Sequence, residues 1–367
     1  MGPSECGFGG RRRRATPMRI GLIVPPWVPV PPPAYGGTEA VVGNLAEGLK
    51  TLGHDVHLFT VGDSTCPVHR YHIFDHPTAQ IGVGEAELMH VLAAYDALAD
   101  MDIIHDHTSL GPFIGAGADG PPVVVTNHGP FTPMRQELFR SMARTAHIIA
   151  ISESQRQAAG TVPISAVIHH GIDLNAYKYG PGGGGYLVFV GRMNPEKGVH
   201  RAVQVARLAR RKLVLITKIR EPAERAYYTE RVRPLMGPDD PEPRELPLEP
   251  RVEVVRHADA LINPIEWPEP FGLVMAESLA CGTPILAFPN GAAPEIVEHG
   301  RTGFLCRDAD AMVDALDQVH LLDRRDCRDA AERRFGRLRM ARDHERLYRT
   351  ILTGERTSRA VEPAPVS

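Results

Sequence analysis

Aromatic side chains, long apolar runs and net charge are all scarce in this sequence. Phe, Trp and Tyr make up 6% of the residues, so aromatic stacking platforms are not expected to be a main feature. No apolar run reaches the about 18 residues of a transmembrane helix. The formal net charge is −3, which gives no electrostatic reason to expect a nucleic acid or an anionic membrane. We therefore expect no nucleic-acid partner and no transmembrane segment, and peripheral membrane contact stays open.

Cysteines are few, odd in number and widely spaced. They are Cys6, Cys66, Cys281, Cys306 and Cys327. Such spacing argues against a disulfide framework or a zinc ribbon and fits a reducing compartment. The sequence therefore predicts a cytoplasmic protein.

Glycine and proline, by contrast, are abundant. The 35 glycines and 33 prolines make up about 19% of 367 residues, against about 12% in average usage. With 43% hydrophobic and 23% charged residues the chain is still globular. At about 150 residues per domain, its length predicts two domains, each with its own core.

The N-terminal part alternates strands and helices. Residues 1–17, which contain Arg11 to Arg14, show no apolar periodicity, so we expect a disordered leader or a true start at Met18. An N-terminal domain is predicted over 18–172. Its predicted strands are 19–24, 54–60, 102–105, 123–126 and 147–151, and its first helix is 41–52, ended by Gly53. This alternation predicts a parallel sheet covered on both faces.

The alternation restarts after a glycine run. Residues 173–185, which include Gly182 to Gly185, are predicted to be a flexible linker, and 186–334 a second domain. Its predicted strands are 186–190, 212–217, 258–263, 284–288 and 303–306, with a helix over 199–209. A charged helical stretch over 324–353 is predicted to pack on the outside, and 354–367 is predicted to be a disordered tail. The fold class is thus α/β, with two doubly wound domains facing a cleft.

The segment Asp239 to Pro250, DDPEPRELPLEP, interrupts the second alternation. A strand is expected there, but prolines cannot donate to a central ladder. We predict an irregular loop, followed by a helix that starts near Arg251.

Two segments of the second domain contain candidate site residues. GRMNPEKG places Arg192 and Lys197 in a strand-to-helix loop, where two cations beside a helix N-terminus suit a diphosphate. PEPFGLVMAESLA places Glu269 before a helix and Glu277 inside it, while Gly272 allows close backbone approach. Carboxylates accept hydrogen bonds from sugar hydroxyls, and free helix N–H groups suit phosphate. Solvated cations and a helix cap with an exposed Glu remain the alternatives.

The N-terminal domain offers weaker candidates. Gly36 and Gly37 precede a helix, which fits an anion-binding loop or a plain tight turn. His128 follows a predicted strand at the cleft edge, and His105 and His107 form a similar, weaker case. No carboxylate or Cys cluster lies near them at ligand spacing, so no metal site is expected.

Five segments taken together resemble the family 4 glycosyltransferases: PPPAYGGTE, NHGPF, HHGID, GRMNPEKG and EPFGLVMAE. These are retaining enzymes of the GT-B fold, built from two Rossmann-like domains, that use nucleotide sugars. The resemblance covers residues 18–351. Its best-known mark is the pair of carboxylates separated by seven residues.

The resemblance implies a role for each candidate. Arg192 and Lys197 would bind the donor diphosphate, Glu269 the donor sugar, Glu277 the nucleotide ribose, and His128 the transferred sugar. The backbone of Phe271 and Gly272 would contact the phosphates. Gly36 and Gly37 would leave room for the diphosphate and the acceptor. The resemblance also implies a C-terminal helix, about 335–353, that crosses back to the first domain. A nucleotide-diphosphate sugar would be the co-substrate, with neither a cofactor nor a metal.

The segment 239–250 departs from the family pattern at a place that helps to read the nucleotide base. The identity of the nucleotide base therefore stays open. Whether the altered segment reduces activity also stays open. A non-catalytic sugar-nucleotide-binding protein and a nucleotide-sugar 2-epimerase remain alternatives, the latter disfavoured by the Glu pair with the Arg/Lys loop. A phosphorylase is disfavoured because no lysine context suggests a pyridoxal site. The donor sugar, the acceptor and the oligomeric state stay open.

Overall fold

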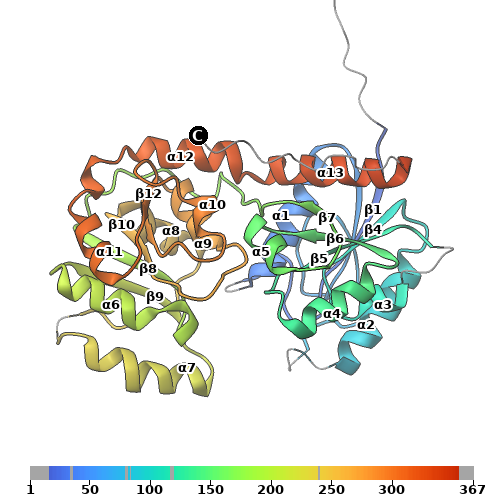
Figure 1. Cartoon of the computed structure of the whole chain (residues 1–367). Coiled ribbons are helices and arrows are strands. Elements are labelled where there is room, and N and C mark those ends of the chain that lie inside the picture. The colour runs from blue at the N-terminus through green and yellow to red at the C-terminus, as the bar shows by residue number, and fades with distance from the viewer. Residues whose placement is uncertain are drawn as a thin grey trace, which may run out of the picture.

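The structure is a computed structural model that describes residues 16–33, 36–78, 82, 84–115, 120–238 and 240–354. Almost all of the predicted leader and tail lies outside the described residues, as do Ala34, Tyr35 and Asp239. Within the described part, two parallel sheets stand side by side, each with helices packed around it (Figure 1).

The first sheet, with its helices, is called the N-terminal domain here. Its seven described strands run in the order β3-β2-β1-β4-β5-β6-β7. They are β1 Arg19–Ile23, β2 Asp55–Phe59, β3 His69–Tyr71, β4 Ile103–Asp106, β5 Val123–Thr126, β6 Ala146–Ala150 and β7 Ile164–Val167. The helices are α1 Gly37–Thr51, α2 Gly84–Ala97, α3 Gly111–Gly115, α4 Pro133–Met142, α5 Glu153–Ala158 and, from the far end of the chain, α13 Arg337–Thr353.

The second sheet forms the C-terminal domain. Its five described strands run in the order β12-β11-β10-β8-β9. They are β8 Tyr186–Arg192, β9 Lys212–Lys218, β10 Ala260–Asn263, β11 Ile285–Ala287 and β12 Gly303–Leu305. The helices are α6 Val199–Leu208, α7 Pro222–Tyr227, α8 Leu248–His257, α9 Leu273–Ala280, α10 Ala293–Ile296, α11 Ala309–Leu316 and α12 Arg324–Arg334. Four single turns complete it: η1 Pro195–Lys197, η2 Tyr228–Val232, η3 Arg233–Leu235 and η4 Val319–Leu321.

The central strands are buried because parallel sheets are covered on both faces. β4 and β5 are buried at every residue, and β1 pairs with β2 on one side and β4 on the other. α1 ends as predicted, because Gly53 has φ +96° and takes the left-handed conformation that stops a helix. The predicted α/β class, with two doubly wound domains, is confirmed.

The predicted helical stretch over 324–353 is two helices rather than one. α12 ends at Arg334 and α13 begins at Arg337, with Phe335 and Gly336 between them. In Figure 1 the two helices run across the top of both domains, α12 over the second and α13 over the first. α13 is not merely a solvated outer helix, because Met340, Ala341 and Tyr348 are fully buried in the core that includes α1 and β1.

The glycine run is tied down rather than free. The N–H groups of Gly180, Gly182 and Gly184 donate to carbonyls at the ends of α9 and α8 at 2.9–3.2 Å. These bonds attach the glycine run to the C-terminal domain, whereas the flexibility predicted for 173–185 stays a prediction. The chain crosses between the domains twice, near Ile172 and between α12 and α13, and the two crossings lie side by side. There the Ile172 carbonyl accepts a hydrogen bond from Arg337 N at 2.9 Å, and Ile172 N donates to Phe335 O at 2.8 Å.

The described residues of the proline-rich segment form the predicted irregular loop. Only Arg244 pairs with the sheet, exchanging backbone hydrogen bonds with Leu215 and Thr217 of β9 at 3.2 and 3.0 Å. The helix that follows starts at Leu248, three residues before the predicted start near Arg251. The loop thus adds a single bridge where a further strand would otherwise extend the sheet.

Candidate functional site

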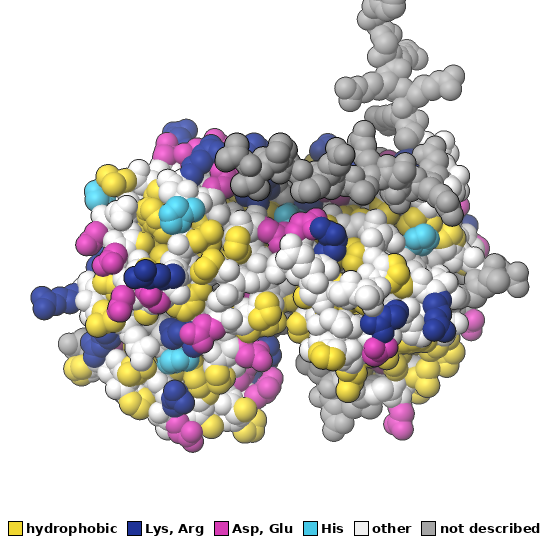
Figure 2. Space-filling view, viewed as in Figure 1, with side chains coloured by type: hydrophobic (Ala, Val, Ile, Leu, Met, Phe, Trp, Pro, Cys, Tyr) yellow, Lys and Arg dark blue, Asp and Glu magenta, His cyan; other side chains and the backbone are white. Residues whose placement is uncertain are grey.

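A cavity of about 510 Å³ lies between the domains, where strands of both sheets reach their carboxyl ends. Figure 2 shows the two domains separated by a hollow that opens at the lower edge of the view. Clefts at this position are where open α/β sheets bind ligands. Apart from the weaker candidates His105 and His107, every site residue predicted from the sequence lines this cavity: Gly36, Gly37, His128, Arg192, Lys197, Glu269, Phe271, Gly272 and Glu277.

The loop after β8 is held in a fixed shape. Asn194 accepts a hydrogen bond from Lys197 N through its side chain at 3.0 Å. Gly198 has φ +70°, and a Cβ there would lie 2.4 Å from the carbonyl oxygen of Pro264, so only glycine fits before α6. The Lys197 ammonium contacts the Glu269 carboxylate and lies 5.6 Å from the centroid of the Trp267 ring. The loop therefore presents its lysine to the neighbouring carboxylate on the same wall of the cavity.

The start of α9 leaves backbone donors free beside that pair. Gly272 precedes the helix with φ +93° and makes no side-chain cap. The positive φ of Gly272 disfavours any larger residue there, and a Cβ would also push aside the flexible end of Met275, whose Cε would lie 2.5 Å away. N–H groups at a helix start carry partial positive charge and suit an anion.

Glu277 lies in the second turn of α9 and is held from two sides. Tyr177 donates its hydroxyl to one carboxylate oxygen at 2.8 Å, and Arg251 Nη2 lies 3.9 Å from the other. The Glu277 charge raises the pKa of Arg251 above its ordinary value. Burial, followed by the same carboxylate, raises the pKa of Tyr177. Glu277 therefore presents a pre-positioned hydrogen-bond acceptor to the cavity.

Several buried polar atoms of the cavity lining have no hydrogen-bond partner among the described residues. They are Arg192 Nε, Thr217 Oγ1, Arg251 Nε and Trp267 Nε1. Buried polar groups are paired in most native structures, so this group of atoms indicates a site for a polar ligand. Sequence reasoning missed Thr217, Arg251 and Trp267, although Thr217 lies at the carboxyl end of β9, where a ligand contact is expected.

The N-terminal wall contains the predicted glycines and two histidines. Gly36 is the N-cap of α1, and a Cβ there would lie 2.7 Å from Pro32 Cβ. A Cβ at Gly37 would be 3.7 Å from Leu273 of α9, so the glycine faces the opposite domain. His128 and His170 stack with ring centroids 5.2 Å apart. Burial lowers the pKa of His128 to about 4, so this wall carries a neutral imidazole at pH 7.

His105 and His107 do not line the cavity. His105 bonds Tyr348 of α13 at 2.7 Å and Thr126 of β5 at 2.8 Å, both through its ring nitrogens. His107 Nδ1 lies 2.9 Å from His128 Nε2. Both residues thus support the site from behind. Among the described residues, no group of three or more His, Cys, Asp or Glu is arranged to hold a metal ion.

Comparison with known proteins gives matches along most of the chain. The profile described as "Glycosyltransferase Family 4" matches residues 35–176, and "Glycosyl transferases group 1" matches residues 184–321. The chain belongs to the family 4 glycosyltransferases. The predicted family, fold and enzyme class are thereby confirmed.

Relatives of this glycosyltransferase cover most of its length. Phosphatidyl-myo-inositol mannosyltransferase of Mycolicibacterium smegmatis is 26% identical over 339 residues, which span 82% of this chain and 84% of the relative. Alpha-maltose-1-phosphate synthase of Mycobacterium tuberculosis is 28% identical over 342 residues, 80% of this chain and 86% of the relative. The crystal structure of AviGT4, a glycosyltransferase involved in avilamycin A biosynthesis, aligns with a TM-score of 0.70 and 26% identity, covering 92% of this chain and 99% of AviGT4.

The same fold occurs in a structure of Anabaena HepE in complex with UDP and glucose. It aligns with a TM-score of 0.70 at 20% identity and covers 90% of this glycosyltransferase and 98% of HepE. No described helix of the glycosyltransferase is both long and apolar enough to cross a membrane.

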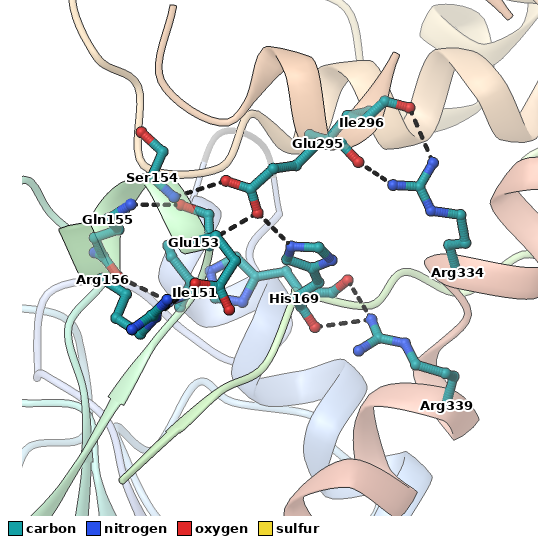
Figure 3. Close-up of polar contacts among 12 residues, drawn as sticks. Ile151, Glu153, Ser154, Gln155, Arg156, His169, Glu295, Ile296, Arg334 and Arg339 are labelled. Atoms are coloured by element: carbon teal, nitrogen blue, oxygen red, sulfur yellow. Dashed lines mark hydrogen bonds and ion pairs between the residues drawn. The ribbon is translucent and has the colours of Figure 1, made fainter. Parts of the chain in front are cut away.

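A contact between the two domains of the glycosyltransferase flanks the site, and sequence reasoning missed it. Figure 3 shows Glu295 of α10 pointing at the start of α5, where its carboxylate accepts from Glu153 N at 2.8 Å and Ser154 N at 2.7 Å. The same carboxylate lies 2.9 Å from His169 Nε2. Burial alone would raise the pKa of Glu295, but the bonds from His169 and the two N–H groups lower it below its ordinary value.

Two arginines fix the segments that carry this contact (Figure 3). Arg334 of α12 donates to the carbonyls of Glu295 and Ile296. Arg339 of α13 donates to the carbonyls of His169 and His170 at 2.8 Å each. The contact of Glu295 with α5 and His169, called the Glu295 contact below, thus holds the domains together beside both crossings.

Proposed function

We propose that this glycosyltransferase moves a sugar from a nucleoside diphosphate sugar to an acceptor hydroxyl, with retention of configuration at the anomeric carbon and without a resident metal. One observation carries the proposal: Arg192 and Lys197 line the same cavity as the pair Glu269 and Glu277, beside the free start of α9. This combination offers positive charge for a diphosphate and carboxylates for sugar hydroxyls. The HepE complexes with UDP and glucose and with UDP-glucose support a nucleotide sugar as the donor.

The positive groups would act on the leaving diphosphate. Negative charge grows on its outer oxygen as the glycosidic bond breaks, and pre-organised donors stabilise such charge strongly. Lys197 is the residue placed to do this, since its side chain is only 15% exposed and Glu269 holds its ammonium. Arg192 Nε is buried with no hydrogen-bond partner among the described residues and would provide the second donor. A leaving group neutralised in this way needs no separate acid.

The carboxylates would hold the two ends of the donor. Glu269 would accept hydrogen bonds from hydroxyls of the transferred sugar, and Glu277 would accept them from the ribose diol. The hydrogen bond from the Tyr177 hydroxyl at 2.8 Å sets the orientation of the Glu277 carboxylate. Retention would follow from front-face attack, in which the leaving phosphate helps to take the acceptor proton. Closure of the domains over the cavity would exclude water and favour transfer over hydrolysis.

We also place the enzyme in the cytoplasm. Cys66, Cys281, Cys306 and Cys327 are buried free thiols, and burial raises the pKa of Cys306 to about 11. Inert reduced thiols of this kind are compatible with a reducing compartment. Fractionation of cells that express the tagged chain would test the location.

The test of the proposed activity starts with a panel of UDP-, GDP- and ADP-sugars. The true donor should raise the melting temperature, because a ligand at 100 times its Kd stabilises the native state by about 2.7 kcal/mol. Turnover of that donor with an acceptor library, with and without EDTA, then checks transfer and metal independence, and NMR of the product checks the anomer. Epimerised donor without any acceptor product would indicate an epimerase. Binding without any turnover would indicate a non-catalytic homologue.

A further inference from the structure

The hydrogen bond between His107 and His128 fixes where the ring protons of this pair lie. His107 Nδ1 and His128 Nε2 are 2.9 Å apart; His128 lines the N-terminal wall of the cavity, and His107 lies behind it. Burial, and then the neighbouring histidines, lowers the pKa of each. Both rings are therefore neutral at pH 7, and a neutral imidazole has one N–H donor and one bare nitrogen. A single proton must lie between the two rings.

Two arrangements satisfy that bond, and they differ in cost. If His128 donates from Nε2, His107 must carry its own proton on Nε2. That nitrogen is buried and has no partner among the described residues, so a buried N–H would be left unsatisfied. If His107 donates from Nδ1, its Nε2 is only a bare lone pair. Orphaned buried N–H groups are rarer than under-satisfied acceptors, which favours donation by His107.

We infer that His107 is a positioning residue that locks His128 in the Nδ1–H tautomer, so that His128 meets the ligand as a hydrogen-bond donor. Its Nε2 accepts from His107, and no described residue bonds its Nδ1. Since His128 lines the cavity, Nδ1 is the ring nitrogen that remains for a ligand oxygen. The inference deepens the proposed function, on which it depends for the nature of that ligand.

The assignment excludes a second role for His128. A ring whose only bare nitrogen accepts from His107 cannot take the proton of an acceptor hydroxyl. His128 would instead donate to an oxygen of the transferred sugar, and the acceptor proton would go to the leaving phosphate. His107 acts only through His128, because it does not line the cavity.

The tautomer is measurable in the ligand-free protein. Ring 15N shifts of protein labelled with [15N]histidine separate protonated from bare nitrogens, and the His128 signals are those lost in the variant His128→Asn. At pH 7.5 we expect the His128 Nδ1 to be protonated and its Nε2 bare. The reverse pattern, or a doubly protonated ring, would overturn the inference. This measurement requires no substrate, so it stands or falls separately from the proposed function.

Two nearly identical variants test the consequence for catalysis. In His107→Asn an amide NH2 can replace Nδ1–H as the donor to His128. In His107→Asp a carboxylate can only accept, which forces the proton onto His128 Nε2. We expect the Asn variant to keep kcat within about threefold of wild type, and the Asp variant to lose about a hundredfold in kcat at unchanged KM for the donor.

The controls separate positioning from folding. Melting temperatures and the 15N spectrum are recorded for both variants, and exposed His320 provides the neutral control His320→Gln. A folded Asp variant with protonated His128 Nε2 and wild-type kcat would contradict the inference. Equal losses in the Asn and Asp variants would also contradict it, because they would show that only the packing of the imidazole matters.

Discussion

On the C-terminal side of the cavity, Arg192, Lys197, Arg251, Glu269 and Glu277 all carry charge. The N-terminal side presents no formally charged side chain among the described residues that line it, only glycines, apolar residues, Thr38 and two neutral histidines. The difference shows how the work is divided. A charged wall suits the diphosphate and the diols of a donor, whereas a neutral wall leaves the acceptor to be chosen by shape and by uncharged hydrogen bonds.

The largest effect should come from removing charge from the C-terminal wall. Lys197→Ala is expected to lower kcat/KM by about 100- to 1,000-fold, because a pre-organised donor to the leaving group is lost. Steady-state kinetics with the donor found by thermal shift would measure it. Lys212→Ala, at the exposed start of β9, should leave the rate unchanged. If Lys197→Ala also leaves turnover intact, the charged wall does not act on the leaving group.

Acid should put charge on the neutral N-terminal side by protonating its buried histidines, and this should lower the stability of the fold. Burial lowers the pKa of His128 and His344 to about 4, and those of three further buried histidines well below their ordinary value, namely His105, His107 and His170. Between about pH 6.5 and 4 the unfolded chain takes up protons that the folded chain refuses. The free energy of unfolding should therefore fall as pH falls through this window, by about 1.4 kcal/mol per pH unit for each such proton.

Thermal or urea unfolding at pH 7, 6 and 5 measures this slope. The variant His344→Gln should make the slope shallower, whereas His320→Gln, at an exposed position, should leave it unchanged. A stability that does not change between pH 7 and 5 would show that the N-terminal wall tolerates charge.

A smaller effect is expected from Glu277, whose charge serves binding rather than bond cleavage. Glu277→Gln should raise the KM for the donor about tenfold to a hundredfold at nearly constant kcat, because hydrogen bonds to a charged group are worth about 1.5–3 kcal/mol. Tyr177→Phe removes the hydroxyl that orients this carboxylate and should raise KM less. The matched control is Glu230→Gln at an exposed position. A drop in kcat with no change in KM would show that Glu277 contacts the reacting sugar and not the nucleotide.

The smallest effect tests how the two walls are held together. Glu295→Gln weakens the Glu295 contact and should cost about 1 kcal/mol of stability. Because the folded-state pKa of Glu295 is lowered, its contribution is complete above about pH 4.5 and is lost as pH falls through the folded-state value. The difference in melting temperature between wild type and variant should therefore shrink in acid. A constant difference would mean that the charge contributes nothing.

The sequence predicted the elements best where they are buried and bounded by clear signals. The strand over 123–126 has the predicted limits, since an apolar run between prolines and a polar turn can hardly be placed otherwise. β3 and β7 were missed because β3 is three largely exposed residues long and β7 is only half-buried. The residue pattern alone did not mark the break at Phe335 and Gly336, because α12 and α13 are both arginine-rich and share one continuous helical pattern. The family resemblance did imply a separate crossing helix over about 335–353.

The nine site residues predicted from short motifs all line the cavity, because motifs at strand ends place their side chains at the carboxyl edge of a sheet. Contacts between distant segments could not be predicted in that way. Glu295 and Ser154 are 141 residues apart in the chain, and only the packing of the two domains brings them together. Arg251 was missed for a related reason. The local sequence predicts only that it lies near the start of a helix, whereas its position in the cavity depends on the loop that precedes this helix.

The late position of α13 in the chain has a consequence for folding during synthesis. Domains of a growing chain usually fold in order, the N-terminal one first. Here Met340, Ala341, Leu347 and Tyr348 complete the core around β1 and α1, and they are made only after every strand of the other domain. A ribosome-bound chain would therefore finish its C-terminal domain first, while the strands made earliest wait for a helix made last.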